Sequence, residues 1–205
     1  VYKRQVMLRS VADLGNSLGS DSFAIRVVHE QTGIVFRLLE PGEFRIGSPD
    51  EYGRTDEHPR YKVLISRRFY VAETPITVAQ WRVFEGQTNY KTCAERMESG
   101  ITLCADGRWR THKKARWDNP IPQLEFELHG THPVTQVTWN DVQEFCKHYT
   151  FRLPTEAEWE YACRAGTESA YWWGDDPNAG RKCGKFCDQS FARKFGVDPD
   201  FPHFP

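Results

Sequence analysis

The sequence has no long apolar run. In its 205 residues, no stretch approaches the roughly 20 consecutive apolar residues that a membrane-spanning helix needs. No basic start followed by an apolar segment and a small-residue cleavage site marks a secretory signal. We therefore expect no membrane partner and a cytoplasmic location.

An excess of charge of either sign is also missing. Lys and Arg number 27 and Asp and Glu number 28, which gives a net charge of −1. These charges are interleaved along the chain, so the sequence does not indicate the basic surface by which proteins bind nucleic acids. We expect no nucleic-acid partner.

The chain has no initiator methionine. It begins at Val1 and ends in a proline-rich segment at Pro205, so we expect both ends to be truncated. We expect residues 1–32 to be a poorly ordered lead-in or the tail of a preceding segment. Residues 33–205 are then one domain, because 39% hydrophobic and 14% aromatic content suffices for a real core.

One segment in the last third of the chain has the features of a complete short helix. Thr155 suits the N-cap, and Glu158 lies three residues on, where it closes a capping box. Pro154 and Trp159 are spaced to form a hydrophobic staple. Gly166 is suited to end the helix in the left-handed conformation.

Two further threonines are spaced in the same way. Thr77 with Gln80 predicts a helix that ends near Gly86, and Thr138 with Asp141 predicts another. The second helix has one apolar face, formed at helical spacing by Val142, Phe145, Cys146 and Tyr149.

Strands are expected mainly in the first third of the chain. An apolar run over 34–39 meets a Pro-Gly turn, and 43–47 follows as the returning strand of a hairpin. Tyr61, Val63 and Ile65 alternate with polar residues, as in a half-buried strand. The sequence after residue 173 has no periodicity and is expected to be loop.

Four segments, in order, resemble the formylglycine-generating enzyme family, whose domains are also called sulfatase-modifying factors. They are Gly42–Ser48, Glu57–Pro59, His132–Val142 and Arg152–Gly166. The resemblance implies an α+β fold that is irregular, loop-rich and an elaborated variant of the C-type lectin fold. It also implies that several residues are structural: Trp139, Cys146, Thr155, Glu158, Trp159 and Cys163.

The resemblance implies an activity as well. Family enzymes oxidise a cysteine of a target protein to formylglycine, using oxygen and a copper(I) ion held by two cysteines. Thiolates suit this ion because it is soft. No segment of the present chain matches that cysteine pair, so we expect it beyond Pro205. We expect residues 1–205 to be inactive alone, and the intact parent to act on a cysteine segment of a target protein or peptide.

Two residues match binding positions of the family. Trp109 corresponds to an aromatic residue of the substrate groove, and a flat apolar ring suits an extended peptide. Asn178 corresponds to a position that supplies a calcium ligand in some members, so calcium is a second candidate metal. Asp175, Asp176 and Asn178 are alternatively a solvated turn.

The six cysteines leave several interpretations open. Cys146 and Cys163 match cysteines that form structural disulfides in some members, but each is alternatively a small buried apolar residue. The other four are candidates for a zinc site or for two disulfides: Cys93, Cys104, Cys183 and Cys187.

Two histidines also invite a metal interpretation. His129 and His132 lie near Glu125 and Glu127, but they precede a proline in a loop without helical geometry. Solvent-facing or capping histidines are the alternative, and His132 matches a structural histidine of the family.

Two other functions stay open from the sequence. The domain is alternatively a non-catalytic, lectin-like module that binds a protein or ligand within a fusion protein. It is alternatively a relative of the nonhaem-iron sulfoxide synthases, which need a histidine triad contributed partly by another domain.

Overall fold

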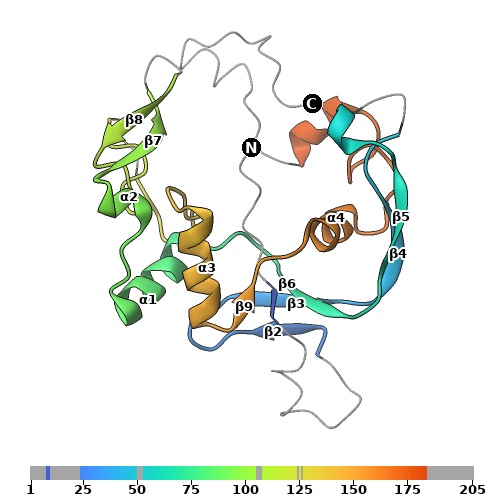
Figure 1. Ribbon diagram of the computed structural model, residues 1–205, viewed down its shortest axis with the longest axis horizontal. Coiled ribbons are helices and arrows are strands. Elements are labelled where there is room, and N and C mark those ends of the chain that lie inside the picture. The colour runs from blue at the N-terminus through green and yellow to red at the C-terminus, as the bar shows by residue number, and fades with distance from the viewer. Residues whose placement is uncertain are drawn as a thin grey trace. The chain divides into compact units, whose positions relative to one another are not determined.

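The computed structural model describes residues 8–9, 24–49, 53–104, 108–123, 125 and 127–183. Helices and strands are mixed along the chain, and long stretches are irregular, as Figure 1 shows. The chain divides into two compact units: residues 1–39 with 69–154, and residues 40–68 with 155–205. The predicted α+β, loop-rich fold class is confirmed.

The first unit contains a five-stranded sheet. Its strand order is β2-β3-β6-β1-β9, and each pair of neighbours is antiparallel. The strands are β1 (Leu8–Arg9), β2 (Arg26–Val28), β3 (Val35–Leu39), β6 (Phe69–Ala72) and β9 (Phe151–Arg152).

The core of this unit joins the sheet to two helices, α1 (Val78–Thr88) and α3 (Trp139–His148). Trp81 of α1 is fully buried, and its ring stacks on that of Phe145 of α3, with centroids 5.4 Å apart. Phe36 of β3 and Phe151 of β9 bring the sheet into the same cluster. Burial of this aromatic surface is the main stabilising contribution to the unit.

A short helix and a hairpin follow α1. They are α2 (Cys93–Arg96), β7 (Ser99–Leu103) and β8 (Trp109–Lys113). The Gln136 side chain fixes this hairpin, because its Nε2 donates to the carbonyl oxygens of Ile101, at 2.7 Å, and Pro120, at 3.3 Å.

The second unit holds a two-stranded sheet and one α-helix. β4 (Gly42–Ile46) pairs with β5 (Tyr61–Ile65), and α4 (Glu156–Arg164) lies against β4. The Tyr161 ring of α4 packs on Phe44, and its hydroxyl donates to the Glu40 carbonyl oxygen at 3.1 Å. Gly42 allows this close approach, because a Cβ at this position would lie 2.5 Å from the tyrosine oxygen and the Tyr161 side chain would have to shift. Two 3₁₀ helices complete the described part, η2 (Thr55–Glu57) and η3 (Pro177–Lys182).

All three predicted capping boxes are present. The side chains of Thr77, Thr138 and Thr155 each accept a hydrogen bond from the backbone N–H three residues on. The predicted apolar face of α3 is also confirmed, because its four residues are all buried. The helix signals in this sequence are therefore local and reliable.

The predicted hairpin over residues 34–47 is wrong. β3 pairs with β2 and β6, whereas β4 pairs with β5, so the Pro-Gly turn leads from one sheet to another. Two helix ends also differ from the prediction. α1 continues to Thr88, and α4 ends with Ala165 in the left-handed conformation at φ 48°, directly before Gly166 at φ 85°.

Regular structure begins before residue 33. β2 lies within the expected lead-in and forms one edge of the five-stranded sheet, and β1 also belongs to this sheet. The domain boundary at residue 33 remains a prediction.

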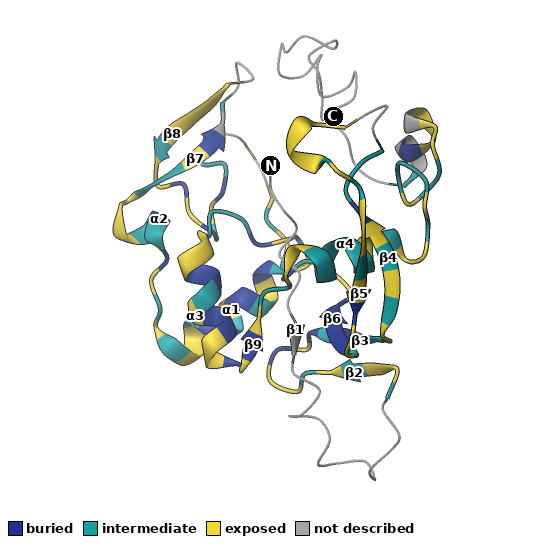
Figure 2. Ribbon diagram, turned by 45° about the vertical axis from the view of Figure 1, so that its right-hand side comes forward, coloured by how far each residue is buried: buried dark blue, intermediate teal, exposed yellow. Residues whose placement is uncertain are grey.

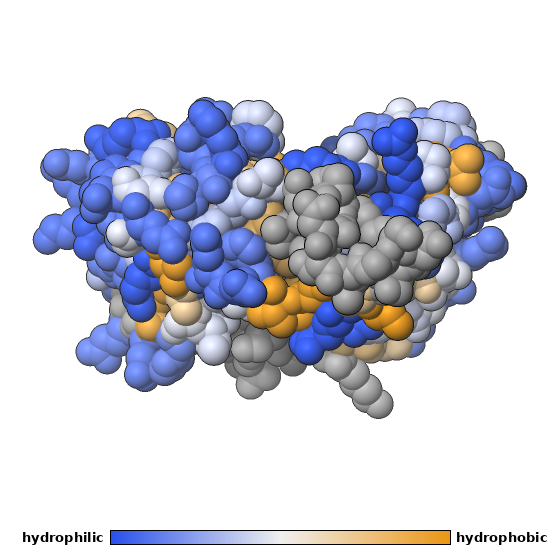
Figure 3. Space-filling model, turned by 90° about the horizontal axis from the view of Figure 1, so that it is seen from below, coloured by the Kyte–Doolittle hydropathy of each residue, from blue (hydrophilic) through white to orange (hydrophobic). Residues whose placement is uncertain are grey.

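Buried residues gather in a few elements, and one face of the molecule is mainly hydrophilic (Figure 2 and Figure 3). Figure 2 shows buried residues concentrated in β6, α1 and α3, and Figure 3 shows separate hydrophobic patches on a mainly hydrophilic face. Among the described residues no helix is long and apolar enough to cross a membrane.

Candidate functional site

Trp109, the expected substrate contact, lies at the start of β8. Its side chain is 60% exposed. It pairs across the hairpin with Leu103, and Ile101 on β7, which is 58% exposed, is its diagonal neighbour on the same face. Two large apolar side chains therefore lie on the solvent face of one hairpin.

Asn178, the expected calcium ligand, lies in η3 of the second unit and is exposed. Its backbone N–H donates to Asp176 Oδ1 at 2.8 Å, so Asp176 caps the 3₁₀ helix. Asp175 Oδ1 accepts a hydrogen bond from the Ala170 N–H at 2.8 Å. Both carboxylates thus stabilise a turn, and Asn178 as a calcium ligand remains a prediction.

The helix α4, which lies in the family-like segment Arg152–Gly166, is stabilised by its cap and by a bond between two of its own side chains. Thr155 N–H donates to Glu158 Oε2 at 2.8 Å, and Glu158 N–H donates to Thr155 Oγ1 at 3.2 Å, which closes the capping box. Glu160 Oε1 accepts from Arg164 Nε at 2.8 Å. Trp159 is half-buried and lies outside the main core cluster.

Trp139 occupies the first turn of α3, and its indole is 67% exposed. Because the indole is mostly exposed, it does not support the structural role expected for Trp139 through burial. The neighbouring cap residue Thr138 fixes the start of the helix instead.

Cys146 and Cys163 lie in different surroundings. Cys146 is buried in the core of the first unit, and burial raises the pKa of its thiol to about 12. Cys163, in α4, is exposed. Neither forms a disulfide with another described cysteine. The burial of Cys146 fits the alternative interpretation as a small apolar core residue, and the disulfide interpretation of both cysteines remains a prediction.

The remaining described cysteines are also free. Cys93 and Cys104 belong to the first unit and Cys183 to the second, and Cys187 lies outside the described residues. The Cys93 sulfur lies 3.6 Å from the Met97 sulfur. The proposed zinc site and disulfides therefore remain predictions.

His129 and His132 stabilise the loop that precedes Pro133. His132 Nδ1 accepts the His129 backbone N–H at 3.1 Å, and the His132 carbonyl oxygen accepts the N–H of Val78 at the start of α1. His129 also lies 3.7 Å from Glu127. This geometry supports the structural interpretation of His132.

Within the described part of the chain, no group of three or more His, Cys, Asp or Glu side chains could hold a metal ion. These residues thus provide no donor set for the copper ion that the sequence resemblance implies.

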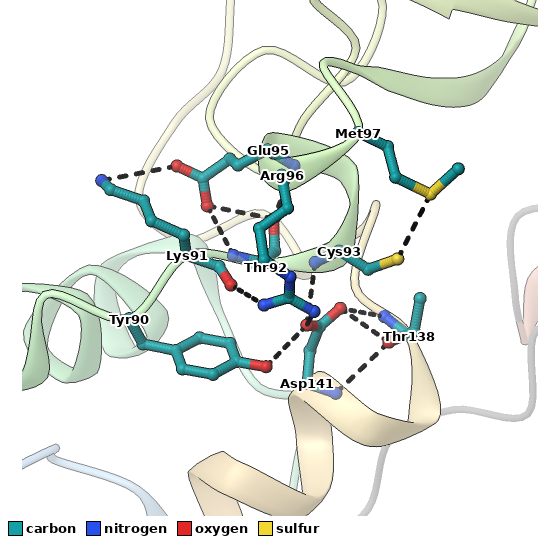
Figure 4. A network of polar contacts seen from close by, with 9 residues as sticks. All are labelled: Tyr90, Lys91, Thr92, Cys93, Glu95, Arg96, Met97, Thr138 and Asp141. Carbon is teal, nitrogen blue, oxygen red and sulfur yellow. Dashed lines mark hydrogen bonds and ion pairs between the residues drawn. The ribbon is translucent and has the colours of Figure 1, made fainter.

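A polar cluster of the first unit surrounds Asp141, which is fully buried (Figure 4). Its Oδ2 accepts from the Thr138 N–H and hydroxyl, both at 2.7 Å. Its Oδ1 accepts from the Tyr90 hydroxyl and the Cys93 N–H, both at 2.9 Å. Arg96 Nη2 lies 3.9 Å from Oδ1.

This cluster joins two helix starts. The carboxylate closes the capping box of α3, and the same carboxylate receives the first backbone N–H of α2. Burial raises the pKa of the Tyr90 hydroxyl, although its hydrogen bond with Arg96 opposes this effect. Tyr90 therefore remains a neutral donor to Asp141 over the physiological pH range. The arrangement is suited to fix the α2–β8 region on the helical core.

The sequence predicted only part of this cluster. Asp141 was expected as the third residue of a capping box, and its partners on α2 were not expected. A signal for α2 was available, because Thr92 and Glu95 have the same three-residue spacing and form a fourth capping box. The contact between α2 and Asp141 had no local signal, since 48 residues separate Cys93 from Asp141.

Most of the chain matches a known family of protein domains. Residues 27–198 match the family model of the sulfatase-modifying factor enzyme 1-like domain. The chain belongs to this family. The sulfatase-modifying factor domain thus includes strands and helices from both compact units.

Similar proteins have different activities. The chain is 34% identical over 168 residues to a formylglycine-generating enzyme of Mycobacterium tuberculosis, covering 69% of this chain and 55% of that protein. It is 29% identical over 167 residues to the inactive C-alpha-formylglycine-generating enzyme 2 of Bos taurus, covering 67% and 51%. It is 30% identical over 141 residues to a hercynine oxygenase of Mycolicibacterium thermoresistibile, covering 62% and 29%. The chain spans about half the length of the first two relatives.

One solved structure supports the fold. The structure of PvdO from Pseudomonas aeruginosa matches with a TM-score of 0.55 and 20% identity, covering 74% of this chain and 55% of that one. This likeness concerns the arrangement of the sulfatase-modifying factor fold alone.

Proposed function

We propose that the intact parent protein is a copper- and oxygen-dependent oxidase that converts a cysteine of a target protein to formylglycine. The observation that carries this proposal is the family match over residues 27–198, together with 34% identity to a protein named formylglycine-generating enzyme. In this proposal residues 1–205 supply scaffold and binding surface.

The catalytic cysteine pair is proposed to lie outside residues 1–205. The described cysteines are single thiols, and the described residues form no metal-binding group. They do not fit a copper(I) site, and no catalytic step is assigned to them. Calcium at Asn178 is retained as a proposal, with Asp176 nearby as a turn-capping carboxylate.

Trp109 is the residue of this chain proposed to contact the target segment. Its exposed ring offers a flat apolar face that loses little side-chain entropy when an extended peptide binds.

A non-catalytic role is the second candidate. It is supported by the 29% identity to a relative whose name describes it as inactive. Since the match with a hercynine oxygenase is of similar identity, an iron-dependent oxygenase is the further alternative within the same family.

The direct test uses the protein encoded by the full open reading frame and, beside it, residues 1–205. Each is incubated aerobically with copper(I) and a cysteine-containing peptide of a sulfatase, and aldehyde is trapped with an aminooxy probe and located by mass spectrometry. The proposal expects aldehyde with the full protein and none with residues 1–205.

Two results would reject the oxidase proposal. Absence of aldehyde from a folded, copper-loaded full protein would favour the non-catalytic role. Turnover of hercynine with iron(II) but not of the cysteine peptide with copper would favour the iron-dependent branch. Replacing each downstream cysteine by serine in the full protein then identifies the pair.

A further inference from the structure

β8 has one edge that faces away from β7. The Cys104 N–H donates to the Arg108 carbonyl at 2.8 Å, and the Lys114 N–H donates to the Glu98 carbonyl at 3.3 Å. Because hydrogen-bonded and non-hydrogen-bonded pairs alternate in an antiparallel ladder, the main-chain groups of Thr111 and Lys113 point outward. Within the described residues, β8 pairs only with β7.

The hairpin is packed on one face only. Thr102 of β7 is 1% exposed and faces the unit, whereas Ile101 and Trp109 are more than half exposed on the opposite face. Figure 2 shows β8 as exposed along most of its length. The strand therefore offers an outward edge with an apolar aromatic surface beside it.

Positive charge is concentrated on this strand. The segment 108–116 contains five cationic side chains and no carboxylate, although the whole chain has a net charge of −1. Arg116 is paired with Asp118 at 2.6 Å, and Arg108 and Arg110 have contacts of their own within the protein. Lys113 and Lys114 are exposed. Like charges oppose pairing of two copies of this edge, since basic side chains on an edge strand repel each other.

We propose that the outer edge of β8 binds an extended, acidic segment of a partner protein by addition of a strand. Main-chain groups of the segment pair with Thr111 and with the Lys113 N–H, because the Lys113 carbonyl already contacts Nδ1 of His112. One apolar side chain lies beside Trp109, and a carboxylate faces Lys113, which is on the same face of the hairpin. Because alternate side chains point to opposite faces, the apolar and acidic residues that meet Trp109 and Lys113 occupy alternate positions of the segment. The proposal goes beyond the oxidase function, since this binding needs no copper, oxygen or target cysteine.

A peptide fits this edge better than a nucleic acid does. Outward N–H and C=O groups alternate along β8, and another peptide main chain matches both kinds of group. Nucleic-acid binding instead relies on cations that contact phosphates and on aromatic rings that stack on several bases. The hairpin exposes a single aromatic ring, Trp109.

The test is fluorescence anisotropy of labelled probes with the 205-residue chain at low salt. The main probe is the peptide Glu-Glu-Leu-Glu-Leu-Glu-Glu. Three matched probes are the same peptide with Lys in place of Glu, the acidic peptide with N-methyl groups at alternate residues, and an oligothymidine of equal length. Among the four probes, we expect saturable binding only for the unmodified acidic peptide.

Protein variants locate the site. Lys113→Glu replaces an attraction by a repulsion and is expected to weaken binding about tenfold at low salt. Arg67→Glu makes the same charge change at an exposed position between β5 and β6, and is expected to leave the affinity unchanged. Thr111→Pro removes an outward N–H and is expected to weaken binding. Circular dichroism and thermal unfolding confirm that each variant is folded.

Several outcomes would overturn the proposal. Equal binding of the N-methylated peptide would mean that charge alone, and not strand pairing, holds the probe, and this test leaves the protein unaltered. Tighter binding of oligothymidine would make the surface a nucleic-acid site. An unchanged affinity of Lys113→Glu, or absence of saturable binding to the unaltered chain, would remove β8 as the site.

Discussion

At the scale of single residues, the first unit depends on one buried carboxylate. Asp141 receives four hydrogen bonds from Thr138, Tyr90 and Cys93, so its charge is compensated without a close ion pair. A carboxylate that accepts bonds from several donors cannot be replaced by a group that donates. The residue therefore contributes more than an ordinary helix cap.

We expect Asp141→Asn to lower the free energy of unfolding by about 2–4 kcal/mol, because an amide N–H₂ would face donors in a buried site. Chemical denaturation measures the loss. Asp118→Asn is the matched control, since Asp118 pairs with a half-exposed arginine, and it should cost less than about 1 kcal/mol. Equal losses in the two variants would contradict the assigned role of Asp141.

A second residue-scale prediction concerns pH. Burial raises the pKa of the Cys146 thiol to about 12, whereas the unfolded thiol ionises near its ordinary pKa of about 8.5. The folded state therefore binds more protons between these values, and stability falls as pH rises through this range, by at most about 1.4 kcal/mol per pH unit from this group. Denaturation curves from pH 8 to pH 11 check the slope.

Cys146→Val removes this ionisation and should make the slope shallower. Tyr90 and Tyr149, whose pKa values burial also raises, add to the slope only above pH 10 and are unchanged in the variant. An identical slope for the two proteins between pH 8.5 and pH 10 would contradict burial of the thiol.

At the scale of elements, three of the four described α-helices were predictable, and the pairing of the strands was not. Three capping boxes could be read from the sequence because all their partners lie within four residues of one another. The partners of β3 and β4 are set by contacts across tens of residues, so the apolar run and Pro-Gly turn suggested a hairpin that does not form. The hairpin of β7 and β8 was missed because its residues lack clear alternation.

The candidate site was also predictable only in part. Trp109 was selected through a family resemblance, and the structure places it on an exposed hairpin. The link from α2 to Asp141, which positions this hairpin region, was not predictable, because Tyr90 and Cys93 have no local feature that indicates a partner 50 residues away.

The cap of α4 gives an element-scale prediction. Thr155→Ala removes the hydroxyl that accepts the Glu158 N–H and should cost about 1 kcal/mol of unfolding free energy. Thr155→Ser keeps the hydroxyl acceptor and should lower the unfolding free energy by only a few tenths of a kcal/mol. The thermal midpoint of each variant is the measurement, and equal midpoints for Ala and Ser would contradict the cap.

The packing of Trp159 in α4 gives a second prediction at the scale of elements. For a fully buried core tryptophan, replacement by alanine costs about 3 kcal/mol or more. Because the Trp159 indole is only half-buried, we expect Trp159→Ala to cost about 2 kcal/mol. The buried Trp81 of α1 is the comparison, and Trp81→Ala should cost clearly more. Equal losses would show that Trp159 is packed as tightly as the core.

At the scale of the whole molecule, family membership is established and activity is proposed. The scaffold is held by capped helices and aromatic packing, and the described residues contain no metal-binding group. The names of its relatives include a formylglycine-generating enzyme, a hercynine oxygenase and an inactive member, so membership of the family does not by itself fix the activity.

The most direct test of the central claim is the oxygen dependence of aldehyde formation by the protein from the full open reading frame. The copper-loaded protein and the sulfatase peptide are mixed in air and under argon, and the peptide is analysed by mass spectrometry. The account predicts formylglycine at the target cysteine in air and an unchanged thiol under argon. An unchanged thiol in both would contradict it.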